Sequence, residues 1–154
     1  MASERLHIIC FGNPLHGDDG FGPALYEDLA LQPLPPRVHL MRADTAGLSA
    51  LACFEGCTTA IVVDALQGYG PPGSLHSLEA GDLGDCADAE STGNLHGAGV
   101  GSLLRLLPVA LPTPPRIRLV GVEIAAVTPF QPGLSAVVAA RLPEALAHVR
   151  SLLA

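Results

Sequence analysis

Charged and aromatic residues are scarce in this chain. Charged residues make up 15% of the 154 positions, aromatic residues make up 4%, and tryptophan is absent. Only eight residues are lysine or arginine, against 15 aspartates and glutamates, so the formal net charge is -7. Nucleic acids and anionic membrane surfaces are bound mainly by basic side chains. The composition therefore disfavours both kinds of partner.

Cysteine pairs and long hydrophobic runs are also missing. None of the four cysteines forms a CxxC pair, so the sequence offers no compact cysteine site for a metal. No apolar run approaches the roughly 18 residues of a membrane span, and no signal-peptide pattern follows the polar N-terminus. We therefore expect a cytoplasmic protein without membrane contact. Since 49% of the residues are hydrophobic, we expect one packed domain over residues 1–154.

Strand-like and helix-like segments alternate along the chain. Such alternation predicts an α/β fold, in which a mainly parallel sheet carries helices on both faces. The ligand site of such a sheet lies outside the carboxyl ends of its strands. We expect strands at 6–11, 38–41, 60–65, 74–78 and 117–122, and helices at 23–31, 48–54, 95–107 and within 133–153.

The loop at 12–20, GNPLHGDDG, follows the first predicted strand. A glycine-rich turn at this place often binds a dinucleotide, but the GxGxxG spacing is missing. Asp18 and Asp19 would also repel a pyrophosphate. The loop is better suited to a cation or a hydrogen-bond donor. The alternative is that both acids only cap the following helix and complement its dipole.

Two further side chains belong to the same predicted edge of the sheet. Asp64 ends the apolar run 60–63, and a carboxylate there is costly unless it is paired or metal-bound. His96 begins a helix, whose N-terminus favours the neutral imidazole that binds metals. Either residue could instead be a cap. Two carboxylates and one imidazole would leave open coordination positions and suit Zn, Ni or Co.

In this order, these features resemble the hydrogenase maturation endopeptidases over nearly the whole chain. The resemblance implies a three-layer α/β/α sandwich, phosphorylase/hydrolase-like, with a mainly parallel twisted sheet. It rests on five segments: GNPLHGDDGFG at 12–22, DTAGL at 44–48, AIVVDA at 60–65, HGAGV at 96–100 and LVGVEI at 119–124.

The resemblance also implies a site and a substrate. Asp19, Asp64 and His96 would be the metal ligands, with Asp19 and Asp64 as the catalytic carboxylates. The implied activity removes the C-terminal extension of a [NiFe]-hydrogenase large-subunit precursor. Nickel would arrive with that precursor, and other divalent metals could substitute for it. Relatives often carry Glu where Asp19 stands. Asp44 comes two positions later than the family's usual acid. We expect a monomer.

Several alternatives remain open at the level of sequence. The metal could polarise the scissile carbonyl, or it could only position the substrate while a carboxylate acts as general base, as in an aspartic-type peptidase. A nickel-binding maturation chaperone without peptidase activity would need the same three ligands. GxSxG and HExxH motifs are absent, which disfavours serine and zincin mechanisms. His16 could contact the substrate, and Glu123 could support a ligand.

Overall fold

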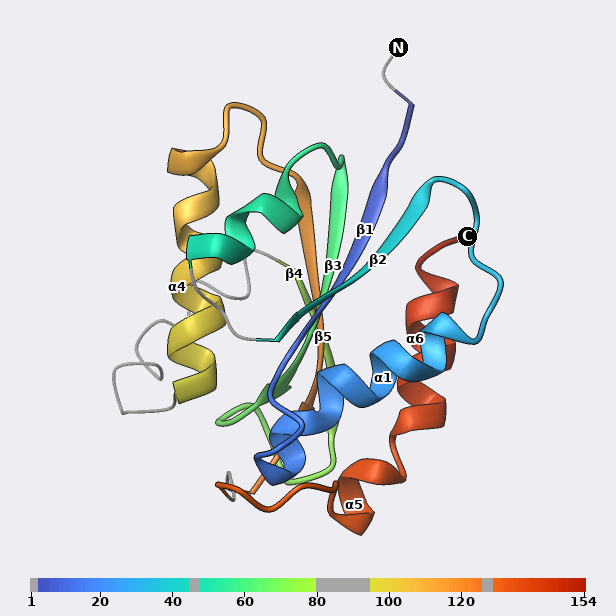
Figure 1. Cartoon of the computed structure of the whole chain (residues 1–154), viewed down its shortest axis with the longest axis vertical. Helices are drawn as coiled ribbons and strands as arrows, with labels where there is room; N and C mark the ends of the chain where they lie inside the picture. The colour runs from blue at the N-terminus through green and yellow to red at the C-terminus, as the bar shows by residue number, and fades with distance from the viewer. Residues whose placement is uncertain (1–2, 45–47, 80–94, 126–128) are drawn as a thin grey trace.

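The computed structural model describes residues 3–44, 48–79, 95–125 and 129–154, except for the side chains of residues 48 and 95–99. Its centre is a five-stranded sheet in the order β2-β1-β3-β5-β4 (Figure 1). The first four strands in this order are parallel, and β4 is antiparallel to β5. The strands are β1 (Leu6–Phe11), β2 (Val38–Asp44), β3 (Thr59–Leu66), β4 (Leu75–Glu79) and β5 (Arg116–Glu123).

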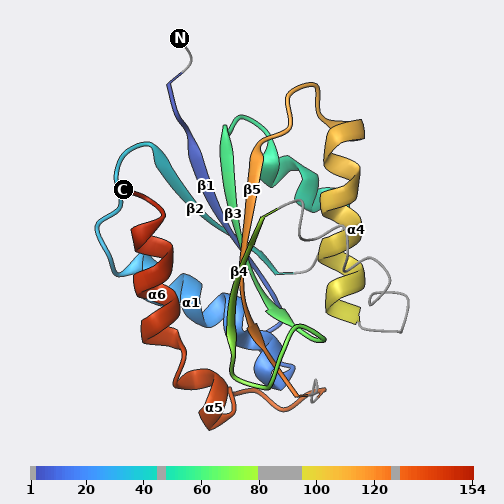
Figure 2. The same ribbon diagram turned by 180° about the vertical axis from the view of Figure 1, so that it is seen from behind.

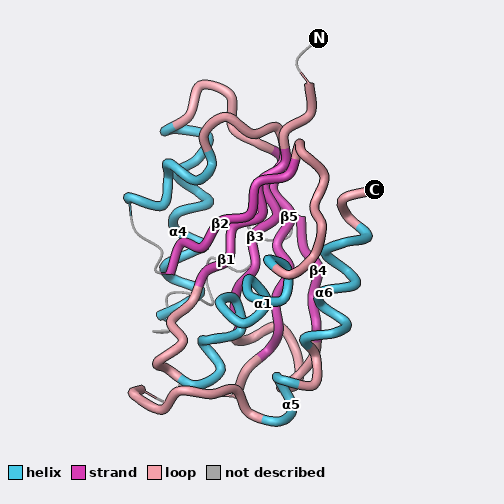
Figure 3. Tube along the Cα trace, turned by 45° about the vertical axis from the view of Figure 1, so that its right-hand side comes forward, coloured by secondary structure: helices cyan, strands magenta, loops and turns pink. Residues whose placement is uncertain are grey.

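Helices cover both faces of this sheet. One face carries α1 and α6, and the other carries η2 and α4 (Figures 1 and 2). Seen closer to edge-on, the strands lie between α4 and α6 (Figure 3). The predicted three-layer α/β/α sandwich is therefore confirmed. The helical elements are η1 (Gly17–Gly20), α1 (Phe21–Ala30), η2 (Leu48–Phe54), α4 (Leu95–Ala110), α5 (Ala136–Ala139) and α6 (Leu142–Ser151).

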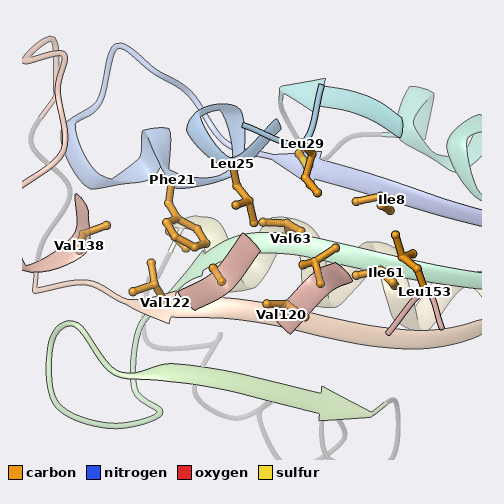
Figure 4. Packing of buried hydrophobic residues seen from close by; sticks show 14 of the residues in the cluster. Ile8, Phe21, Leu25, Leu29, Ile61, Val63, Val120, Val122, Val138 and Leu153 are labelled. Carbon is orange, nitrogen blue, oxygen red and sulfur yellow. The ribbon is translucent and has the colours of Figure 1, made fainter. Parts of the chain in front are cut away.

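The buried apolar side chains form two clusters, one on each face of the sheet. On the α1 side, Phe21 and Leu25 pack with Val63 and Val122 of the sheet (Figure 4). Apolar side chains alternate between the two faces along β3, because successive residues of a strand point to opposite sides. The central strand β3 therefore packs against helices on both faces of the sheet, which fixes the position of the loop that follows it.

Three elements differ from the sequence prediction. The last helical region is divided into α5 and α6, and Pro143 lies in the first turn of α6, where a missing N–H costs no helical bond. The segment η2 is a 3-10 helix. The strand β4 is antiparallel, because the connection 67–74 is too short for the crossover that a parallel strand needs.

The carboxyl ends of β1, β3 and β5 lie at one edge of the sheet. Near this edge are η1, the start of α1, and α5 with the segment before it (Figure 1). The rule for parallel sheets therefore directs attention to the same edge that the sequence indicated. Within the described residues, every helix is too short or too polar to traverse a bilayer.

Gly22 allows α1 to begin directly against the end of β1. Gly22 is buried, and a Cβ placed on it would lie 1.9 Å from the carbonyl oxygen of Phe11. Because that oxygen belongs to the backbone, α1 would have to shift. We expect Gly22→Ala to lower the free energy of unfolding by about 3 kcal/mol. Thermal unfolding should then show a Tm lower by about 6–12 °C.

Gly56→Ala is a suitable control for this substitution. Gly56 has φ +81°, and a Cβ there would meet nothing within 4 Å. Only the left-handed backbone conformation is penalised, at about 1–2 kcal/mol. Equal losses in Gly22→Ala and Gly56→Ala would show that α1 does not need the close approach to Phe11.

Candidate active site

Asp64 is a buried carboxylate inside β3. The strand continues to Leu66, so Asp64 lies within it and not at its tip, and only 2% of the residue is exposed. Its Oδ1 accepts a hydrogen bond of 2.8 Å from the N–H of Ala65. Burial raises the pKa of Asp64 well above its usual value, the charge of Asp19 raises it further, and the Ala65 bond partly offsets both. The alternative in which Asp64 caps the following turn finds no support, since this bond is to the next residue of the strand.

Asp19 is held in η1 beneath the loop that begins at Gly12. The residue is 1% exposed, and its Oδ2 accepts a 2.9 Å hydrogen bond from the N–H of Asn13. Gly12 has φ +139°, and a Cβ there would lie 2.1 Å from the carbonyl oxygen of Asp19. Only glycine therefore lets the chain turn this closely over the acid.

The helix η1, which carries Asp19, packs against β3, which carries Asp64. At this separation the charge of Asp19 raises the pKa of Asp64, second in effect only to burial. Two nearby carboxylates away from water repel each other, and a shared proton or a cation relieves that repulsion. The pair can therefore accept a proton or bind a positively charged ion.

The third predicted ligand, His96, is the second residue of α4. Its side chain lies outside the described residues, so its position relative to the acid pair stays a prediction. Among the side chains that are described, no three histidines, cysteines or acids come together in a way that could hold a metal ion.

Asp18 binds a different part of the chain from its neighbour Asp19. The Oδ1 of Asp18 accepts a 2.7 Å bond from the N–H of Ser135, and its Oδ2 accepts a 2.8 Å bond from the Ser135 hydroxyl. Ser135 immediately precedes α5, so Asp18 ties the acidic loop to the C-terminal part of the chain. The N-cap of α1 is Gly20, without a side-chain cap. The alternative in which both acids cap α1 is therefore wrong.

Glu123 holds the connection between β3 and β4. The side chain is buried, with 4% exposure. Its Oε1 accepts bonds from the N–H groups of Tyr69 (2.8 Å) and Gly70 (3.1 Å), and its Oε2 accepts one from Gly68 (2.9 Å). The carboxylate is thus committed to three backbone donors.

His16 and Asp44 are also placed by the structure. The Nδ1 of His16 accepts a 3.2 Å bond from the N–H of Phe130, a contact that sequence spacing could not reveal. Asp44 has a side chain 62% exposed, bonded at 2.5 Å to the Nε of Arg42. The Asp44 carboxylate is therefore exposed and paired with Arg42, outside the buried pair.

Curated relatives match this chain over nearly its whole length, and the chain spans somewhat under three quarters of theirs. The chain is 31% identical to the hydrogenase expression/formation protein HupM of Azotobacter chroococcum mcd 1, over 99% of this chain and 73% of that protein. It is 29% identical to the hydrogenase expression/formation protein HupD of Rhodobacter capsulatus, over 97% of this chain and 71% of that protein.

Solved structures share the fold. The hydrogenase maturating endopeptidase HybD from E. coli matches with a TM-score of 0.81 and 27% identity, and the alignment covers 97% of this chain and 91% of that one. An endopeptidase from Escherichia coli, determined in solution, matches with a TM-score of 0.84 and 26% identity at the same coverage.

A family model gives the assignment. The model for hydrogenase maturation protease matches residues 23–151, which include Asp64 and His96. The loop that carries Asp19 precedes the matched residues, but it lies within the nearly full-length alignment to HupM. The match extends over most of the sequence, and the relatives cover almost all of it. The chain belongs to the hydrogenase maturation protease family.

Proposed function

We propose that this protein is the endopeptidase that removes the C-terminal extension of a nickel-loaded [NiFe]-hydrogenase large-subunit precursor. The observation that carries the proposal is the buried pair Asp19 and Asp64 at the carboxyl edge of the sheet, in a member of a protease family. We expect the protein to act in the cytoplasm as a monomer, without nucleic acid or membrane.

Nickel enters this proposal as part of the substrate. A divalent ion carried by the precursor would relieve the repulsion between Asp19 and Asp64, so binding the loaded precursor would be favoured over binding the empty one. Carboxylates alone prefer hard cations such as Mg²⁺ or Mn²⁺, whereas imidazole suits nickel. In our proposal His96 supplies that nitrogen, and other divalent metals bind the same set with lower selectivity.

The acid pair also provides the general base for peptide hydrolysis. A base works best when its pKa lies near the working pH, where it still accepts a proton readily. In our proposal Asp64 takes the proton from the attacking water, because burial, the larger cause of its raised pKa, persists when the ion of the precursor compensates the charge of Asp19. Asp19, held by Asn13, then positions the loaded precursor. This is an aspartic-type mechanism, and metal polarisation of the carbonyl remains its competitor.

The test is a cleavage assay with purified protein and purified precursor. We expect the nickel-loaded precursor to lose the mass of its C-terminal extension, and the nickel-free precursor to remain intact. Equal cleavage of both forms would contradict recognition through nickel. Tight binding of the loaded precursor without any mass loss would instead favour the second candidate, a nickel-binding maturation chaperone.

A further inference from the structure

Two large apolar side chains are exposed beside the acidic loop. Phe130 is 82% exposed and Leu15 is 55% exposed. Leu15 belongs to the loop that carries Asp19, and Phe130 contacts the next residue, His16, with ring centroids 5.3 Å apart and ring planes at 68°. We call these two side chains the Leu15–Phe130 surface. Its Leu15 lies in the same loop as Asp19 of the candidate active site.

Phe130 is held in an unfavourable backbone conformation. Its φ is +59°, in the left-handed region that bulky residues rarely adopt. Two hydrogen bonds maintain the segment: Phe130 N–H to His16 Nδ1, and Gly17 N–H to the carbonyl oxygen of Gln131 at 2.7 Å. Such strain persists only where the surroundings enforce it, and it clusters at functional sites. Here the two hydrogen bonds hold the backbone in a conformation that leaves the Phe130 ring exposed to solvent.

Leu15 is anchored to the acid pair by a short chain of contacts. Its N–H donates a 2.9 Å bond to Oδ1 of Asn13, and the N–H of Asn13 donates to Oδ2 of Asp19. The position of Leu15 is therefore coupled to the position of Asp19. Ordering two apolar side chains before a partner arrives lowers the entropy cost of binding.

We propose that the Leu15–Phe130 surface docks the precursor, and that its occupant is the extended segment next to the scissile bond, seated through an apolar side chain. This inference rests on the proposed function and adds a substrate-binding site to it. Continuity with the candidate active site favours this occupant, because Leu15 and Asp19 share one loop and Phe130 contacts His16 of the same loop. A second copy of the chain is disfavoured, since two side chains fall far short of the roughly 1,000 Å² that a stable interface buries.

The test compares alanine variants at this surface with matched controls. The controls are Leu31 and Val109, which are 83% and 85% exposed. Leu31 directly follows α1, and Val109 lies in the last turn of α4; both helix ends are on the side of the sheet away from the acidic loop. We expect Phe130→Ala to raise KM for the nickel-loaded precursor about tenfold to a hundredfold, and Leu15→Ala to raise it about tenfold, with kcat within twofold of wild type. Leu31→Ala and Val109→Ala should leave both constants unchanged. Phe130→Leu, which keeps an apolar side chain, should recover most of the affinity.

Binding to the intact precursor, measured by titration calorimetry, separates this inference from the proposed function. Weaker binding of Phe130→Ala than of Leu31→Ala supports docking even if wild-type protein proves unable to cleave. Wild-type KM and affinity in Phe130→Ala and Leu15→Ala would overturn the docking surface while leaving cleavage intact. So would a lower kcat at unchanged KM, because the two side chains would then only support the acidic loop. A concentration-dependent dimer that Phe130→Ala dissolves would overturn the proposed occupant.

Discussion

Asp64→Asn is expected to abolish precursor cleavage and at the same time make the folded protein more stable. Asparagine removes the buried charge, while its Oδ1 can still accept the bond from Ala65. The loss of a general base costs about 10²–10⁴-fold in rate. Removing the charge removes both its desolvation cost and its repulsion by Asp19, which should raise the free energy of unfolding by about 0.5–2 kcal/mol.

The gain in stability has a definite pH dependence. The pKa of Asp64 is higher in the folded state than the usual value near 4, so the folded state holds this proton more tightly. Wild-type protein is therefore destabilised progressively as pH rises from the unfolded pKa through the folded one. The Tm advantage of Asp64→Asn should be absent below about pH 4 and greatest above the raised pKa.

Thermal unfolding from pH 4 to pH 8, with a chelator present to remove bound cations, measures this advantage. Asp18→Asn is the matched control, because Asp18 is a neighbouring acid with two partners in Ser135. It should lose about 1 kcal/mol through weaker bonds and keep cleavage activity. An Asp64→Asn protein that is less stable than wild type at pH 8 would show that the buried charge carries no penalty.

The sequence predicted the parts of this molecule that depend on local pattern. The apolar run 60–63 required a buried strand, and the rule for parallel sheets then placed Asp64 at the same edge as the loop after Phe11. The placement of η1 beside β3 follows from those two steps. Neither step requires knowledge of side-chain contacts.

What the sequence could not supply are contacts between distant segments. Asp18 and Asp19 are adjacent carboxylates, yet one binds Ser135 and the other binds Asn13 and raises the pKa of Asp64. The partner of Asp18 lies 117 positions away, so local sequence does not reveal which of the two acids it binds. The placement of Phe130 likewise depends on His16, its partner across 114 positions.

Asp19→Asn and Asp64→Asn are expected to be non-additive in stability. Each substitution removes the same repulsion between the two carboxylates, so the double variant should gain less than the two single gains together, by about 0.5–3 kcal/mol. Activity should be non-additive as well, with similar residual cleavage in all three variants, because the two acids act as a unit.

Asp19→Asn alone provides a second readout of the same contact. Its amide oxygen can keep the bond from Asn13, so the loop should stay folded. Without the charge of Asp19, the pKa of Asp64 should fall but remain above its usual value, because burial is the larger cause. The pH range over which ionisation of Asp64 destabilises the folded protein should therefore lie lower than in wild type.

The Asp19–Asp64 comparison is a double-mutant cycle, and its control is the cycle that combines Asp64→Asn with Asp18→Asn. The charge of Asp18 is not among the causes of the Asp64 shift, so these two effects should add to within about 0.5 kcal/mol. If Asp19 and Asp64 were also additive, their carboxylates would not interact. A cation from the precursor would then have no repulsion to relieve, and the general base would lose the neighbour that helps to raise its pKa.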